Sequence, residues 1–227
     1  SIASQVRANP SAGFSIVSYN SGSSTGNYTL GHGLNSAPQF IIHKSRASGN
    51  WWAYHASVID DTSKYLQLNS GSAIATNSAP MWGAALPTSS VFGVRVGDLI
   101  GTNTDTIAYC FAPVAGYSAM GSYTGNGSTD GPCIALSFRP AFVLIKNING
   151  TDRWTIQDTS RSTFNASTDT LAPNLSNAEL ASAFDLDFLS NGFKVRSTNS
   201  GHNSSGSTYI WYAVAENPFQ ANGGLAR

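Results

Sequence analysis

The chain has 227 residues, of which only 11% are charged, and its 12 basic and 12 acidic side chains give a formal net charge of zero at pH 7. Binding to nucleic acid by counterion release needs a basic stripe, and binding to a membrane surface needs a Lys/Arg-rich amphipathic segment; the sequence has neither. We therefore expect no nucleic-acid partner and no membrane partner, and no apolar run approaches the ~20 residues of a membrane span.

The sequence contains an internal duplication, because residues 13–113 align with residues 116–216 along most of their length. A period of about a hundred residues is longer than the ~20–50 residues of a solenoid unit and has the size of a small domain. We therefore divide the chain into an N-terminal lead-in (1–12), a first repeat (13–115), a second repeat (116–220) and a C-terminal tail (221–227).

Within each repeat, short runs rich in β-branched and aromatic residues recur about every ten residues, separated by loops of Gly, Asn, Ser and Asp. This spacing is typical of antiparallel β-sandwiches. In chain order, the first repeat is predicted to have strands at 13–19 and 28–30 and around Phe40, Trp52, Leu66, Phe92 and Tyr109, and the second repeat to have their counterparts. The sequence predicts an all-β fold of two tandem, jelly-roll-like antiparallel sandwiches, with a helical turn expected only at 177–184.

The dipeptide Trp51-Trp52 provides the candidate binding residues. Neighbouring residues of a strand point to opposite faces, and Trp52 aligns with Trp154, so we expect Trp52 and Trp154 to be buried rings. Trp51 then shares the other face with His55, and its counterpart in the second repeat is Arg153. An exposed indole flanked by polar groups can stack on a sugar ring, so Trp51, His55 and Arg153 are the candidate ligand-binding residues. The alternative is that Trp51 is covered by the other repeat or by a neighbouring subunit.

Catalytic and metal signatures are absent from the sequence. The four histidines are scattered, no H-E-x-x-H or zinc-type Cys/His spacing occurs, and the pattern G-x-S-x-G is missing. The segment beginning at Asp185 starts like a calcium loop, but Leu189 stands where an oxygen ligand is needed. A pair of glycosidase carboxylates need not be close in sequence, so this class stays open. We expect no catalytic residue, no metal and no cofactor.

The two cysteines do not follow the repeat. Cys110 aligns with Ala213, and Cys133 has no counterpart in the first repeat. Their apolar, strand-like neighbours favour two buried free thiols over a disulfide that would cross the repeats.

Several stretches carry a family resemblance: 122–132, 138–146, 187–196 and 213–219 in the second repeat, and 31–34, 51–55 and 64–69 in the first. They resemble a domain of unknown function that recurs in virion proteins of tailed phages, many of them marine or cyanobacterial, where it often follows a concanavalin-like laminin-G module. The resemblance covers about residues 6–220. One departure is Pro113, where relatives tend to have Glu, as the second repeat has at Glu216. No activity or catalytic residue is assigned to this family.

The resemblance implies a non-enzymatic protein of the virion surface, either in a tail fibre that contacts host glycans or as a capsid decoration. Its expected partners are other virion proteins, further copies of itself and a host surface glycan. The alternative function is a carbohydrate-active depolymerase of sandwich fold. A cleft with two facing carboxylates would favour the depolymerase, because a binding module does not require it.

Overall fold

The structure is a computed structural model that describes residues 1–181 and 183–218; the predicted tail, 221–227, and residues 219–220 lie outside the described residues. Within the described part, the fold is all-β with antiparallel sheets, as the strand spacing predicted. The described residues divide into two compact units: unit 1 comprises Ser1–Leu68 and Ile74–Pro113, and unit 2 comprises Asn69–Ala73 and the described residues from Val114 onward. In the described part, no helix has both the length and the apolar character needed to span a membrane.

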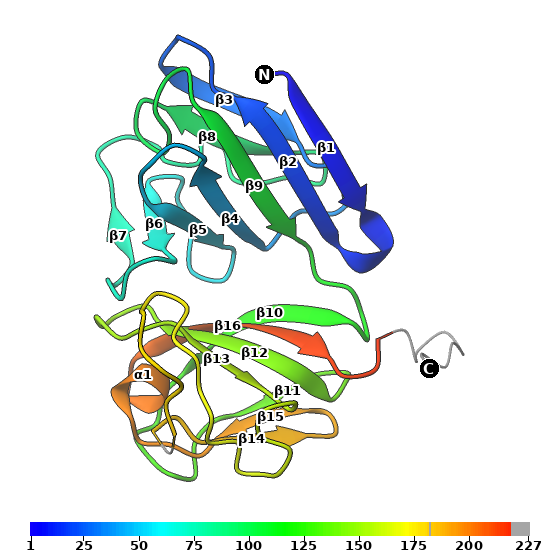
Figure 1. The fold of residues 1–227 in the computed structure, drawn as a ribbon, viewed down its shortest axis with the longest axis vertical. Coiled ribbons are helices and arrows are strands. Elements are labelled where there is room, and N and C mark those ends of the chain that lie inside the picture. The colour runs from blue at the N-terminus through cyan, green and yellow to red at the C-terminus, as the bar shows by residue number, and fades with distance from the viewer. Residues whose placement is uncertain (182, 219–227) are drawn as a thin grey trace. The chain divides into compact units, whose positions relative to one another are not determined.

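Unit 1 consists of a seven-stranded sheet with the order β1-β2-β9-β4-β5-β6-β7 and a two-stranded sheet, β3-β8 (Figure 1). Its elements are β1 (Ser4–Asn9), the 3₁₀ turn η1 (Pro10–Ala12), β2 (Phe14–Asn20), β3 (Gly26–Gly31), β4 (Phe40–Ser45), β5 (Trp51–His55), β6 (Lys64–Gln67), β7 (Ala75–Thr76), β8 (Val91–Val96) and β9 (Asp105–Phe111).

The core of unit 1 lies between its two sheets. Val17 and Ile41 from the large sheet and Phe92 and Val94 from the small sheet are all fully buried in one apolar cluster. The residue between Phe92 and Val94 is Gly93. No side chain fits at this position, because a Cβ there would be 2.1 Å from the carbonyl oxygen of Trp82. Each strand therefore contributes alternate side chains to a sandwich core.

Unit 2 pairs a four-stranded sheet, β10-β16-β12-β13, with a three-stranded sheet, β11-β15-β14 (Figure 1). Its elements are β10 (Ser118–Thr124), β11 (Cys133–Ala135), β12 (Pro140–Asn147), β13 (Thr155–Asp158), β14 (Leu186–Leu189), β15 (Gly192–Val195), the helical turn α1 (Ser200–Asn203) and β16 (Thr208–Ala215). Val143 and Trp211 from one sheet and Phe188 and Phe193 from the other share a single buried cluster.

The two units use the same strand order in their larger sheets. In unit 1 this order is β2-β9-β4-β5, and in unit 2 it is β10-β16-β12-β13. In each case the first strand of the repeat lies beside the last strand, and the last strand lies beside a hairpin from the middle of the repeat. The register also agrees, since Ile41 pairs with Cys110 and the aligned residue Val143 pairs with Ala213.

Two local expectations differ from the structure. Residues Ser4–Asn9, expected within a lead-in, form β1 and pair with β2 along six residue pairs. The helical turn expected at 177–184 is wrong for the residues described there, because the backbone of Leu180 pairs with Thr170 in an isolated bridge and no helical turn forms. Leu180 thus exchanges both of its backbone hydrogen bonds with another residue of the same loop, and these groups are satisfied without a helix.

Candidate functional site

The three candidate binding residues have different environments. Trp51 is 38% exposed. His55 shares its strand and its face but is only 1% exposed, and its ring lies 5.9 Å from that of Phe40. Arg153 belongs to unit 2, where its guanidinium lies 5.8 Å from the centre of the Phe184 ring. Trp51 is therefore accessible to a ligand in this structure and His55 is not.

Strand register corrects the expected equivalence of Trp52 and Trp154. In unit 1, Lys44 of β4 lies opposite Trp51. In unit 2, Ile145 of β12 lies opposite Thr155, and extending this register by one residue places Trp154 opposite Lys146. Because Lys44 aligns with Lys146, the structural counterpart of Trp154 is Trp51, and the alignment of Trp52 with Trp154 is wrong by one residue.

Trp52 is half-buried, and it lines a hollow at one end of unit 1. One part of its ring packs on the apolar core and meets Tyr65 edge-on, with ring centres 5.1 Å apart and planes at 84°. The rest of the ring contributes to a hollow of about 280 Å³, which we call the Trp52 hollow. Its walls are the β4–β5 turn and the β8–β9 loop, through Ser45, Ala47–Asn50, Trp52, Gly97–Gly101 and Thr104.

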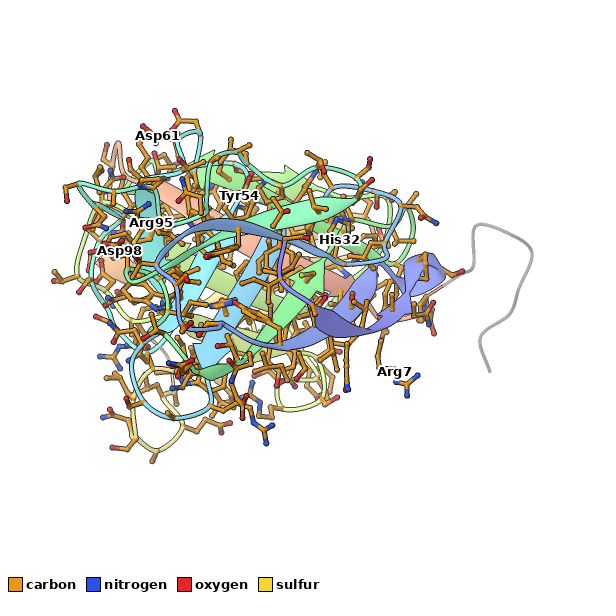
Figure 2. All side chains as sticks on the ribbon, turned by 90° about the horizontal axis from the view of Figure 1, so that it is seen from above. Arg7, His32, Tyr54, Asp61, Arg95 and Asp98 are labelled. Carbon is orange, nitrogen blue, oxygen red and sulfur yellow. The ribbon has the colours of Figure 1, made fainter. Side chains whose placement is uncertain are left out.

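Asp98 is among the polar residues that line the Trp52 hollow. Asp98 is held by Arg95, whose Nε donates to Oδ2 at 2.6 Å, and by Asn77, whose Nδ2 donates to Oδ1 at 3.2 Å. Figure 2 shows Arg95 and Asp98 close together at one edge of unit 1. Two donors fix the Asp98 carboxylate in place, and its remaining lone pairs can accept hydrogen bonds from a ligand. The residues that line the hollow thus include an aromatic ring and an aspartate whose carboxylate is held by two donors.

A second hollow lies at the ends of four neighbouring strands of the large sheet. Its volume is about 410 Å³, and we call it the Arg46 hollow. Its lining residues are Ala3, Ser4, Gln5, Ser18, Tyr19, Asn20, Arg46 and Asp105. It contains one carboxylate, Asp105, and the Trp52 hollow likewise contains one, Asp98. Neither of these two hollows has the pair of facing carboxylates that a glycosidase uses.

Two histidines are buried in the cores rather than placed at a surface. His43 accepts or donates a hydrogen bond at Nε2 with the Tyr19 hydroxyl in unit 1, and His202 does so with Thr155 Oγ1 at 2.8 Å in unit 2. Burial lowers the pKa of each imidazole to about 3, because the charged form loses its solvation. At neutral pH both rings are uncharged and structural. Among the described residues, no three His, Cys, Asp or Glu side chains gather in a way that could hold a metal ion.

The interpretation of both cysteines as free thiols is confirmed, but only one is buried. Cys110 lies in the core of unit 1, where burial raises the pKa of its thiol well above the ordinary value. Cys133 is exposed, and its burial was predicted wrongly, because Ile134 next to it packs against the core and adjacent side chains of a strand point to opposite faces.

A long loop of unit 2, residues 159–181, was not recognised as a candidate site. Phe164 on this loop is 86% exposed, although the side-chain amide of Asn165 next to it is bound to the backbone of Phe188: Nδ2 donates to the carbonyl oxygen at 3.0 Å, and Oδ1 accepts from the N–H at 2.9 Å. The segment that looked like a calcium loop lies nearby in sequence, and its residues 186–189 form β14. No sequence periodicity marks this loop, so an exposed aromatic within it could not be distinguished from a core residue.

The fold and these hollows define a class: an all-β protein of two sandwich units with polar, aromatic-lined hollows at one end of the first unit. Residues 1–218 match the sequence model of the family described as "Domain of unknown function (DUF7483)". The chain belongs to this family. The comparison with curated proteins and the comparison with solved structures gave no match.

Proposed function

We propose that this chain is a non-enzymatic surface module of a tailed-phage particle that binds glycans on the host cell. The observation that carries the glycan part is the Trp52 hollow. A hollow lined by both an indole ring and a carboxylate residue suits a sugar, because the ring can cover the apolar C–H face while the carboxylate accepts hydrogen bonds from hydroxyl groups. The virion part is supported by the resemblance carried by the stretches quoted from both repeats.

The absence of a carboxylate pair in either hollow supports binding rather than hydrolysis. Both inverting and retaining glycosidases need two acidic groups across the scissile bond. Each hollow offers a single carboxylate, and Asp98 is already engaged by Arg95 and Asn77. A single site of this kind binds weakly, so several copies on one particle would provide the avidity that attachment needs.

The test combines retention with polymer length. The purified chain is passed over immobilised polysaccharide from the envelope of a host cell, and the same polysaccharide is incubated with it in solution. We expect retention that is lost in Trp52→Ala and kept in large part in Trp52→Phe, which preserves an aromatic face. Progressive shortening of the polymer would contradict the non-enzymatic proposal and favour the alternative function, a depolymerase.

The location is tested separately on purified phage particles. Antibodies against this chain should label the outside of intact particles, on the tail fibre or on the capsid. Labelling only of infected-cell lysate, with none on intact particles, would overturn the virion part of the proposal and leave glycan retention to be judged by itself.

A further inference from the structure

The large sheet of unit 1 has a second face, which we call the outer face. Val17 and Tyr19 of β2 and Ala108 of β9 belong to the apolar core. Because side chains alternate along a strand, Ser18 and Ile107 point to the opposite side. The outer face of β1, β2, β9, β4 and β5 therefore consists of every second residue of each strand, beginning from Ser18 and Ile107 and following the strand pairing.

Register aligns one row of side chains across all five strands of the outer face. Gln5 lies opposite Ser18, Ser18 opposite Ile107, Ile107 opposite Lys44, and Lys44 opposite Trp51. With strands about 4.8 Å apart, the row extends for about 19 Å. It begins with an amide and a hydroxyl and ends with an ammonium group and an indole that is 38% exposed.

A second row lies next to the first at the ends of the same strands. Asn20 lies opposite Asp105, and its Nδ2 donates to Asp105 Oδ1 at 2.9 Å. The backbone N–H of Arg46 donates to the carbonyl oxygen of Asp105 at 2.8 Å, so Arg46 continues this row. These three residues line the Arg46 hollow together with Gln5 and Ser18 of the first row.

The outer face carries more positive than negative charge. Arg7, opposite Ile16, adds a third cation to Lys44 and Arg46, whereas Asp105 is the one carboxylate at the outer-face positions of these five strands. No hydrogen bond or ion pair joins the guanidinium of Arg7 or Arg46 to another described residue. Figure 2 shows the Arg7 side chain extending away from the ribbon. Three of the chain's 12 basic side chains thus share one face of one sheet.

We infer that the part of the outer face that carries Lys44, Arg46 and Trp51, and not the buried part around Phe40 and His55, binds an acidic polysaccharide through carboxylate or sulfate groups on its sugar rings. This inference rests on the proposed glycan binding and specifies its ligand class. Arg46 offers a planar fork of donors that matches an oxyanion, Lys44 adds a point charge, and Trp51 offers a face for stacking. Gln5, Ser18 and Asn20 are suited to hydroxyl groups.

The spacing of the cations favours a glycan over nucleic acid. Duplex DNA carries one charge per about 1.7 Å of axis and is bound by closely spaced basic groups. Here three cations, Arg7, Lys44 and Arg46, share the outer face with the hydroxyl and amide side chains of Gln5, Ser18 and Asn20. A polymer with one anionic group per sugar ring, and hydroxyl groups between them, fits that pattern better.

The test compares charged polymers with matched neutral ones. Binding of the full chain is measured to polygalacturonate and to its methyl ester, which differ in the carboxylate charge, and to dextran sulfate and dextran, which differ in the sulfate. We expect at least one charged polymer to bind at least tenfold more tightly than its neutral partner, with affinity falling as salt increases. The pair that shows the difference identifies carboxylate or sulfate as the recognised group.

The variant Lys44→Gln/Arg46→Gln should reduce binding of the charged polymer at least tenfold. The matched control is Lys194→Gln/Arg196→Gln in unit 2, which removes the same charge from residues already paired with Asp130 and Asp187. Equal loss in both variants, equal affinity for charged and neutral polymers, or tighter binding to duplex DNA would overturn the inference. Retention of neutral polymer that depends on Trp52 would leave the proposed function intact while the acidic ligand class fails.

Discussion

Lys146 of β12 donates a hydrogen bond from its ammonium group to the carbonyl oxygen of Gly71, at 2.9 Å, within unit 2. The lysine is fully buried, and its Nζ also donates to the carbonyl oxygens of Asn147 and Gly150. Burial lowers the pKa of Lys146 to about 8. Three carbonyl dipoles thus replace the water around the charge and fix the segment Asn69–Ala73 to unit 2.

Replacing Lys146 with Met should lower the free energy of unfolding by about 1–3 kcal/mol, because the buried carbonyl groups lose their donor. The loss is limited because the variant no longer buries a charge. The aligned Lys44 is a matched control: its Nζ donates to Gly49 O at 3.1 Å at an exposed site, so Lys44→Met should change stability by less than about 0.5 kcal/mol. Denaturant titration of both variants measures the difference, and equal losses would contradict the role of burial.

Truncation of Trp154 should be far more costly than truncation of Trp52. Trp154 is 1% exposed, so Trp154→Ala should cost about 3–5 kcal/mol. Trp52 is only partly covered by the core of unit 1, and Trp52→Ala should cost about 1–2 kcal/mol. Thermal unfolding of the two variants provides the comparison. A Trp154→Ala protein that melts within a degree or two of the parent would show that its ring does not support the unit.

The fold class followed from the sequence, but the faces of the Trp51-Trp52 strand did not. Lys44 and Trp51 are separated by seven positions, whereas Lys146 and Trp154 are separated by eight, so the hairpin of the second repeat has one extra loop residue. A shift of one residue reverses which side chains face the core, and a gapless alignment cannot detect it. The hollows were also beyond prediction, because Asp98, Trp52 and Thr104 come from separate segments that meet only in the folded unit.

Stability should fall as the pH decreases from about 6.5 toward 4. The pKa of His43 and of His202 is lowered from 6.5 to about 3 in the folded state, so in this window the unfolded chain binds more protons than the folded chain. Burial also lowers the pKa of His32 and acts in the same direction. Since stability decreases on acidification wherever the unfolded state binds more protons, each neutral histidine contributes a slope of up to about 1.4 kcal/mol per pH unit.

The histidine origin of this slope is tested with His43→Gln and His202→Gln. Each variant should reduce the pH dependence of the unfolding free energy between pH 6.5 and 4, and the double variant should reduce it further. Aspartates with lowered pKa, such as Asp158, act mainly below about pH 4, because their ordinary value is 3.8. An unchanged slope in the double variant would assign the acid sensitivity to other groups.

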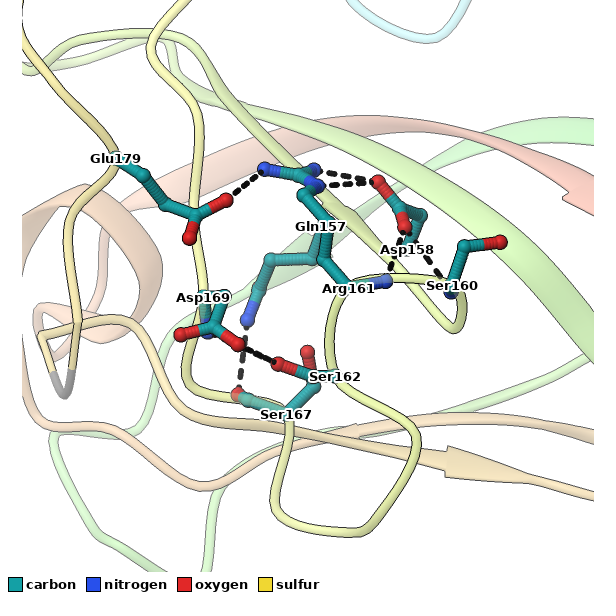
Figure 3. A network of polar contacts seen from close by, with 8 residues as sticks. All are labelled: Gln157, Asp158, Ser160, Arg161, Ser162, Ser167, Asp169 and Glu179. Carbon is teal, nitrogen blue, oxygen red and sulfur yellow. Dashed lines mark hydrogen bonds and ion pairs between the residues drawn. The ribbon is translucent and has the colours of Figure 1, made fainter.

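The loop of residues 159–181 should lose its order when Asp158 is neutralised. Figure 3 shows Arg161 between Asp158 and Glu179. The Nε of Arg161 donates to Asp158 Oδ2 at 2.7 Å, and its Nη1 donates to Glu179 Oε2 at 3.1 Å. The backbone N–H groups of Ser160 and Arg161 donate to Asp158 Oδ1 at 3.0 and 2.9 Å. Burial alone would raise the pKa of Asp158, but the hydrogen bonds from Arg161 outweigh it and the pKa is lowered.

Asp158→Asn keeps the shape of the side chain but removes the negative charge that pairs with Arg161. The amide nitrogen of the new side chain also cannot accept a hydrogen bond. Hydrogen bonds to charged groups contribute about 1.5–3 kcal/mol each, so local protection against hydrogen exchange should fall by about 1–3 kcal/mol across 159–171. The control is Asp130→Asn, which breaks an ion pair with Lys194 where the aspartate side chain is 80% exposed, and should leave the loop unchanged. Unchanged exchange in Asp158→Asn would show that other contacts, such as the bonds of Asn165 to Phe188, keep the backbone of this loop ordered without the ion pair.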